Sequence, residues 1–136
     1  MTYCVRVLAG ILLLAHCTST VAQSPADAWQ LGLQSFQQND YAAALLQFEF
    51  ARDAGQPGPA VHYNIGVCQY KLGSYSKAGN TFESLKTRFP EFVALAEYNL
   101  GLVAAKLDKG DEARRHFRRS YDLSADDVTM VVVKVK

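Results

Sequence analysis

The sequence predicts an all-α protein in which three helical hairpins stack as a solenoid. A glycine, an alanine and a phenylalanine recur along the chain. They are Gly32, Gly66 and Gly101, then Ala44, Ala78 and Ala113, and then Phe48, Phe82 and Phe117. Each step is 34 or 35 residues, and a fixed period of this size marks copies of one supersecondary unit. Apolar residues within a unit have helical spacing, as in Tyr63, Val67 and Tyr70.

The composition fits one globular domain and does not favour nucleic-acid binding. The chain has 136 residues, 49% of them hydrophobic, and a net charge of +1. This length suits a single compact domain. Nucleic-acid binding needs a basic surface, which a nearly neutral composition does not indicate. We therefore expect no nucleic acid among the partners.

The first 22 residues have the organisation of a secretory signal peptide. Arg6 precedes a short apolar run over 7–15, and small and polar residues lead to Ala22. This order is typical of a signal that is removed on export, and the run is too short to span a membrane. We expect cleavage after Ala22 and a mature protein in the periplasm or cell envelope.

The positions of the cysteines offer an alternative to a simple secretory signal peptide and limit disulfide formation in the mature protein. Leu14-Ala15-His16-Cys17 is similar to a lipoprotein signal, although His16 stands where a small residue is expected. We expect membrane attachment only if Cys17 is lipidated or the chain is fused to a further module. After cleavage only Cys68 remains, within a helical pattern. We expect a small buried residue there, the alternative being a reactive or intermolecular thiol.

Capping and turn residues place the helices. Ser24 and Pro25 open the first, Pro59 opens the third, and Pro90 ends the fourth, because the residue before a proline disfavours helix. The helices are expected at about 25–38, 41–54, 59–72, 74–89, 91–107 and 110–123. They form units at about 25–58, 59–90 and 91–124, within a domain that covers 23–125.

The recurring residues also predict how each hairpin closes. A glycine on the first helix and an alanine on the second let the two backbones approach, and the phenylalanine fills the space beside them. Glycine in a helix costs about 1 kcal/mol relative to alanine, so its return in three helices indicates close packing. Gly79 has no equivalent in the other units, and the pattern does not explain it.

The pattern resembles that of the tetratricopeptide repeat family, and of its exported bacterial members. The second unit matches through Ile65-Gly66, Ala78, Phe82 and Pro90, and the other units match at equivalent positions. The third unit departs from the family pattern in ending at Ala125 instead of a proline. The resemblance implies three tetratricopeptide-like repeats in a right-handed superhelix. It also implies a concave groove, lined by the first helices, that binds peptides, and no catalytic activity.

One stripe of each first helix is expected to line that groove. An aromatic residue leads every stripe, and rings can stack on a peptide. In two units an asparagine directly follows the leading aromatic residue, and its side-chain amide can donate a hydrogen bond to a peptide carbonyl. The candidate groove residues are Trp29, Phe36, Tyr63, Asn64, Tyr70, Tyr98 and Asn99. The alternative is packing between helices, which we expect for Leu33, Val67 and Leu102 in the same stripes.

Four arginines form a charge cluster near the end of the third unit: Arg114, Arg115, Arg118 and Arg119. One interpretation is a solvated helix face, balanced in part by acidic neighbours, which are Asp111, Glu112 and Asp122. The other is a docking patch for an acidic partner or for lipid head groups.

No residue pattern points to catalysis. His62 and His116 are far apart in the sequence, and neither a zinc spacing nor a glycine-rich phosphate loop is present. We expect no enzyme activity, no metal and no cofactor. The expected function is an exported scaffold or adaptor that binds a partner protein or peptide, of unknown identity, in the groove. The alternative is a docking or assembly subdomain of a larger cell-envelope or outer-membrane machine.

Residues 126–136 are rich in β-branched residues, including Val131-Val132-Val133. This composition is strand-like and not helical. We expect an irregular or strand-prone tail. Either a longer protein continues from here into a further module, or the tail frays or pairs with another copy.

Overall fold

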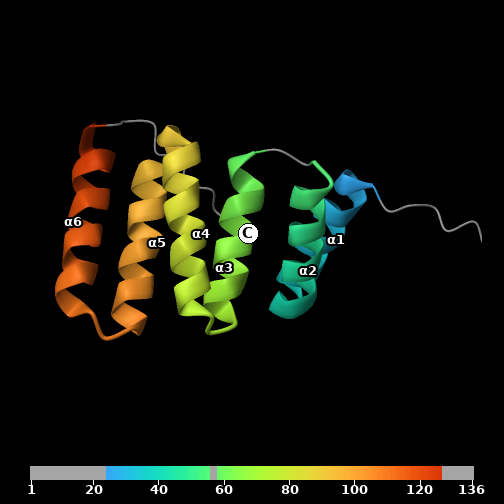
Figure 1. Cartoon of the computed structure of the whole chain (residues 1–136), viewed down its shortest axis with the longest axis horizontal. Helices are drawn as coiled ribbons and strands as arrows, with labels where there is room; N and C mark the ends of the chain where they lie inside the picture. The colour runs from blue at the N-terminus through green and yellow to red at the C-terminus, as the bar shows by residue number, and fades with distance from the viewer. Residues whose placement is uncertain (1–23, 56–57, 127–136) are drawn as a thin grey trace, which may run out of the picture.

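The computed structural model describes residues 24–55 and 58–126, and this part of the chain contains helices and no strand. Six α-helices follow one another in a row (Figure 1). They are α1 (Pro25–Gln37), α2 (Tyr41–Asp53), α3 (Pro59–Lys71), α4 (Tyr75–Arg88), α5 (Val93–Lys106) and α6 (Gly110–Asp126), with a short 3-10 helix, η1 (Pro90–Phe92), before α5. The predicted all-α architecture of stacked helical hairpins is confirmed.

Two details differ from the expected helix bounds. The fifth helix was expected from about residue 91, but a 3-10 turn over Pro90–Phe92 comes first. The sixth helix was expected to end near residue 123, but α6 continues to Asp126. Ser124 there donates its hydroxyl to the Ser120 carbonyl at 2.8 Å, which suits a continuing helix. The predicted signal peptide lies outside the described residues, as does the predicted tail beyond Asp126.

The turn inside each hairpin is built in the same way. One residue adopts a left-handed backbone, with φ of 61° at Asn39, 75° at Gly73 and 58° at Asp108. Glycine, asparagine and aspartate adopt this conformation most readily. The next amide then donates to a carbonyl five residues earlier, which closes the helix end as in a Schellman motif. These donors are Asp40, Ser74 and Lys109, with distances of 2.9, 2.8 and 2.9 Å.

The recurring glycines allow the two helices of each hairpin to touch. A Cβ atom added at Gly66 would lie 2.7 Å from the ring of Phe82, closer than real Cβ contacts. The same added atom would lie 2.6 Å from the Phe48 ring at Gly32 and 2.6 Å from the Phe117 ring at Gly101. The close packing predicted from the sequence is therefore present in all three hairpins.

The second helix of one hairpin packs against the first helix of the next. Two buried clusters make these junctions. The α2–α3 cluster consists of Ala44, Phe48, Val61, Ile65 and Cys68. The α4–α5 cluster consists of Ala78, Phe82, Leu85, Ala96, Leu100 and Val103. Phe48 and Phe82 thus belong both to a hairpin and to a junction, so the core is continuous along the row.

Gly79, which the repeat pattern did not explain, lies at the second junction. A Cβ atom added there would meet Val103 Cγ1 at 3.5 Å, an ordinary van der Waals contact. The position therefore has room for an alanine, in contrast to the three recurring glycines.

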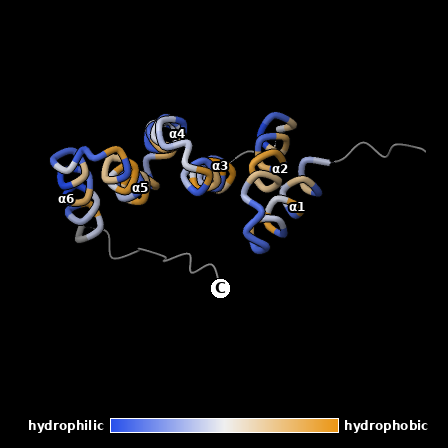
Figure 2. Tube along the Cα trace, turned by 90° about the horizontal axis from the view of Figure 1, so that it is seen from below, coloured by the Kyte–Doolittle hydropathy of each residue, from blue (hydrophilic) through white to orange (hydrophobic). Residues whose placement is uncertain are grey.

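The hairpins give the molecule an elongated shape. Seen from below, the helices follow one another along the row, and α4 is displaced to one side of its neighbours α3 and α5 (Figure 2). None of the helices in the described ranges combines the length and the apolarity that a membrane crossing requires.

Candidate functional site

The leading aromatic of each first helix rests on the phenylalanine of its own hairpin. Ring centroids lie 5.2 Å apart for Trp29 and Phe48, 6.3 Å for Tyr63 and Phe82, and 5.7 Å for Tyr98 and Phe117. All three pairs are tilted, an arrangement that aromatic pairs favour. The leading aromatics are therefore fixed in one orientation by the hairpin beneath them.

A second ring pair occurs at the turn end of the first two hairpins. Phe36 packs edge-on against Tyr41 at 5.3 Å, and Tyr70 packs edge-on against Tyr75 at 5.4 Å. The third hairpin has Ala105 and Gly110 at the equivalent positions, so it cannot make this contact. The aromatic surface is thus fuller in the first two units than in the third.

Most of the predicted groove rings are half-buried, and one is exposed. Trp29, Phe36, Tyr63 and Tyr70 have intermediate exposure, whereas Tyr98 is 49% exposed. Each ring therefore packs on its hairpin through one part and meets solvent through another. The ring packing expected as the alternative is present for one part of each side chain, and contact of the other part with a partner stays a prediction.

Tyr63 on α3 meets the neighbouring first helix, α5. Burial raises the pKa of the Tyr63 phenol, a hydrogen bond from the Asn99 side chain opposes that rise, and the nearby Tyr98 adds to it. Three of the seven candidate residues, Tyr63, Tyr98 and Asn99, therefore lie together across two units. They form one continuous strip in this part of the molecule.

The two asparagines are placed differently from each other. Asn64 Nδ2 donates to the Ala60 carbonyl at 2.9 Å, and Asn99 Nδ2 donates to the Leu95 carbonyl at 2.8 Å. Asn64 is partly exposed, but Asn99 is only 8% exposed. Asn99 was expected to hold a partner's carbonyl, and its burial beside Tyr63 argues against that role. Its amide is instead used within the molecule.

The arginine cluster on α6 is divided among different contacts. Arg114 pairs with Asp111, and Arg119 Nε lies 3.4 Å from Glu97 Oε1 on α5. Arg115 and Arg118 are exposed, and the structure shows no ion pair for either within the described ranges. The partial balancing expected from Asp111 is present. The use of the cluster as a docking patch stays a prediction.

A buried carboxylate that sequence reasoning missed joins the last three helices. Glu97 on α5 is fully buried. It accepts a hydrogen bond from Lys86 Nζ of α4 at 3.2 Å and from His116 Nδ1 of α6 at 2.6 Å. Burial alone would raise the pKa of Glu97, but the hydrogen bonds and charges of His116 and Lys86 outweigh it and lower the pKa. Glu97 is therefore an ionised carboxylate that accepts hydrogen bonds from the helices on both sides of it.

The repeat register contained a signal for this site. Ala28, His62 and Glu97 occupy one equivalent position, and all three are buried. His62 Nδ1 lies 3.1 Å from the Gly58 carbonyl, and His62 Nε2 lies 3.0 Å from Arg88 Nη1. Because the guanidinium can only donate, Nε2 accepts and Nδ1–H donates to Gly58. Two of the three units hold a polar residue at this buried position, and each of these two residues makes a buried polar contact.

Cys68 is fully buried at the junction of α2 and α3. Burial, with a smaller effect of the Glu49 charge, raises the pKa of the thiol to about 12. The predicted buried residue is confirmed, and the raised pKa disfavours the alternative of a reactive thiolate. In the described part of the chain, no group of three or more His, Cys, Asp or Glu residues is arranged to hold a metal ion.

Comparison with known proteins agrees with this architecture. The family model described as tetratricopeptide repeat matches residues 30–91. A solved structure of MamA AMB-1 superposes with a TM-score of 0.69 at 20% sequence identity, and the match covers 75% of this chain and 60% of that one. At this identity the similarity shows the fold alone. The chain spans 60% of the length of that solved structure, and no curated protein sequence matches it.

Proposed function

The chain is a tetratricopeptide repeat protein, and from this premise we propose that it is an exported adaptor that holds a partner protein or peptide along its first helices. Repeats of this family serve as scaffolds for protein–protein interaction. The proposed binding of a partner along the first helices is supported by an aromatic strip on α1, α3 and α5, which consists of Trp29, Phe36, Tyr63, Tyr70 and Tyr98. The rings in this strip are fixed by their own hairpins and keep part of their surface in contact with solvent.

The strip suits a partner that crosses several units. Equivalent rings recur once per hairpin, so an extended or helical segment can contact Trp29, Tyr63 and Tyr98 in succession. Rigid aromatic side chains contribute large contact areas at a small entropic cost, and such residues dominate binding energy at many interfaces. Tyr98 is the ring with the most surface to offer, since it is 49% exposed.

The test is Tyr98→Ala, with Phe50→Ala as its matched control. Phe50 is 43% exposed but lies on α2, a second helix. The partner is first identified by co-purification from the native compartment, and its Kd is then measured for each variant. We expect Tyr98→Ala to weaken binding by tenfold or more, about 1.4 kcal/mol, and Phe50→Ala to leave binding unchanged. Equal binding by both variants, with the fold intact by circular dichroism, would place recognition elsewhere.

Export is a separate part of this proposal, and it rests on the composition of residues 1–22. Mass spectrometry of the protein purified from its native cells tests it. A mature chain that starts at Gln23 supports a soluble adaptor. A lipid on Cys17 supports instead the alternative of an anchored component of an envelope machine. A chain that retains Met1 would contradict export by this signal.

A further inference from the structure

At each internal junction, the second helix of one unit covers three residues of the next first helix. These residues are spaced i, i+4, i+7 and therefore share one helical face. They are Val61, Ile65 and Cys68 on α3, and Ala96, Leu100 and Val103 on α5. All six are apolar, and each is at most 5% exposed. Each unit of the solenoid packs against the unit before it through this face of its first helix.

Within residues 24–55 and 58–126, no helix covers the same face of α1. The equivalent residues are Asp27, Leu31 and Gln34. Leu31 is 45% exposed, whereas Ile65 and Leu100 at the same position are 1% and 5% exposed. Leu31 and Gln34 also line a hollow of about 290 Å³ on α1. On α1, the face that packs against a preceding unit in α3 and α5 therefore has an exposed leucine, Leu31, with a hollow beside it.

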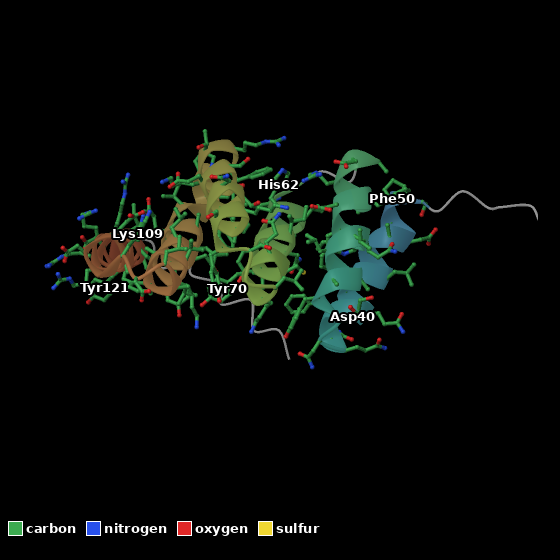
Figure 3. The ribbon with its side chains drawn as sticks, turned by 60° about the horizontal axis from the view of Figure 1, so that its bottom comes forward. Asp40, Phe50, His62, Tyr70, Lys109 and Tyr121 are labelled. Atoms are coloured by element: carbon green, nitrogen blue, oxygen red, sulfur yellow. The ribbon has the colours of Figure 1, made fainter. Side chains whose placement is uncertain are left out.

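The complementary face lies at the other end of the molecule, on α6. On α4, Gly79 and Lys86 face α5, since Gly79 lies beside Val103 and Lys86 pairs with Glu97. The equivalent residues on α6 are Arg114 and Tyr121. With Arg118 between them, they follow the same i, i+4, i+7 spacing. Tyr121 is 74% exposed, and it lies at the opposite end of the row from Phe50 on α2 (Figure 3).

The two faces carry unlike charges, although the two ends as a whole do not. Asp27 is the one charged residue of the α1 face, and α6 as a whole balances four arginines with four acidic residues. The end face of α6 carries Arg114 and Arg118. Unlike charges on two surfaces favour their association and fix its direction. Surfaces that carried like charges would instead repel a second copy.

We propose that a second copy of this chain docks head-to-tail, with α6 of one protomer on the uncovered face of α1 of the next. In the α4–α5 junction Lys86 meets Glu97 and Gly79 meets Val103. The same register places Tyr121 near Ala28 of the second copy and Arg114 near its Gln34. Asp27 and Arg118 then bring opposite charges to the same junction. Such a contact is heterologous and leaves a free end on each side, so it produces open chains. This docking goes beyond the proposed adaptor function, because it uses the outer faces of α1 and α6 and leaves the aromatic strip free to bind a partner.

Sedimentation velocity of the full chain over a series of rising concentrations tests this inference. We expect the average mass to rise without a plateau, and to rise less at high salt, because salt screens the charges. Leu31→Ser should weaken association by about tenfold or more. Its control is Leu46→Ser, since Leu46 is 67% exposed and its equivalent in the second unit, Asn80, is exposed as well.

The opposite end is tested with Arg114→Glu combined with Tyr121→Ser. Its control is Arg115→Glu, which makes the same charge change on an adjacent residue outside the i, i+4, i+7 face. We expect the combined variant to lose association by about tenfold or more and the control to keep it. Circular dichroism verifies that each variant is folded, which the high exposure of these residues favours.

Mixing the two variants separates head-to-tail docking from other contacts. Leu31→Ser keeps an intact α6 face, and the Arg114→Glu/Tyr121→Ser variant keeps an intact α1 face. Each alone should associate about tenfold more weakly than the wild type, or weaker still, but an equal mixture should form dimers that do not grow. A wild-type chain that stays monomeric at every concentration overturns the proposal. So does association that depends on Leu31 but not on the α6 residues, which would indicate a symmetric contact between two α1 ends.

Discussion

At the scale of single residues, the glycines show how the same amino acid can serve two different purposes. Gly66 lies under the ring of Phe82, where an added Cβ atom would be 2.7 Å away, and that ring is only 1% exposed. Because it is buried on all sides, the Phe82 ring cannot shift to make room for an added methyl group at Gly66. Gly79 lies 3.5 Å from Val103 by the same measure, so an added methyl group fits there without displacing a neighbour.

We predict opposite effects of the same substitution at these two sites. In Gly66→Ala, overpacking against Phe82 should cost about 1–3 kcal/mol of stability. The higher helix propensity of alanine should offset about 1 kcal/mol of that cost. Gly79→Ala should leave stability unchanged or raise it by up to about 1 kcal/mol. Urea denaturation followed by circular dichroism measures both. Equal effects at the two positions would show that helix propensity, and not the contact with Phe82, governs Gly66.

At the scale of helices, Glu97 connects α4, α5 and α6 through one buried carboxylate. Its cationic partners are more accessible than it is, since the Lys86 side chain is 21% exposed and that of Arg119 is 66% exposed. Glu97→Gln keeps the size of the side chain but removes its charge. We predict a loss of about 1–3 kcal/mol, because hydrogen bonds to a buried charged group are lost. Arg119→Ala is the control and should cost under about 1 kcal/mol, since the Arg119 side chain is largely exposed and Glu97 keeps its hydrogen bonds from Lys86 and His116.

The same carboxylate predicts how stability depends on pH. The pKa of Glu97 in the folded protein is below its ordinary value of 4.5. A carboxyl group with a lowered pKa stabilises the folded state above the unfolded pKa, and this stabilisation is lost as the pH falls through the folded pKa. The wild-type melting temperature should therefore fall below about pH 4.5. Glu97→Gln should show a shallower fall over that range, and a parallel fall in both proteins would exclude Glu97 as its source.

Local signals predicted the helices, and they could not predict this cluster. Ser24 and the left-handed turn residues Asn39 and Gly73 act within a few residues of themselves, so they can be read from the sequence. Lys86 and His116 are 11 and 19 residues from Glu97, and only the packing of three helices brings them together. The exposure of Asn99 was also beyond local signals. Asn99 is buried whereas its neighbour Tyr98 is exposed, and the packing of the helix determines which of two adjacent residues faces solvent.

At the scale of the whole molecule, stability in a repeat array is the sum of each unit and its junctions with its neighbours. The last helix illustrates this point. Within the described residues, α6 packs on α5 through Ala113 and Phe117, and Ser120 donates its hydroxyl to the Ala94 carbonyl at 2.8 Å. These contacts close the third hairpin without involving any residue beyond 126.

This closure predicts the effect of shortening the chain. Deletion of 127–136 should leave helicity intact and change the free energy of unfolding by less than about 1 kcal/mol, because only contacts outside the closed hairpin are removed. Deletion of 110–136 is the contrasting case. It removes α6, which uncovers Gly101 and leaves Glu97 without His116, so a large loss of melting temperature is expected. Circular dichroism melts of both proteins make the comparison. If the short deletion costs as much as the long one, residues 127–136 contribute to the core, and the solenoid does not end at α6.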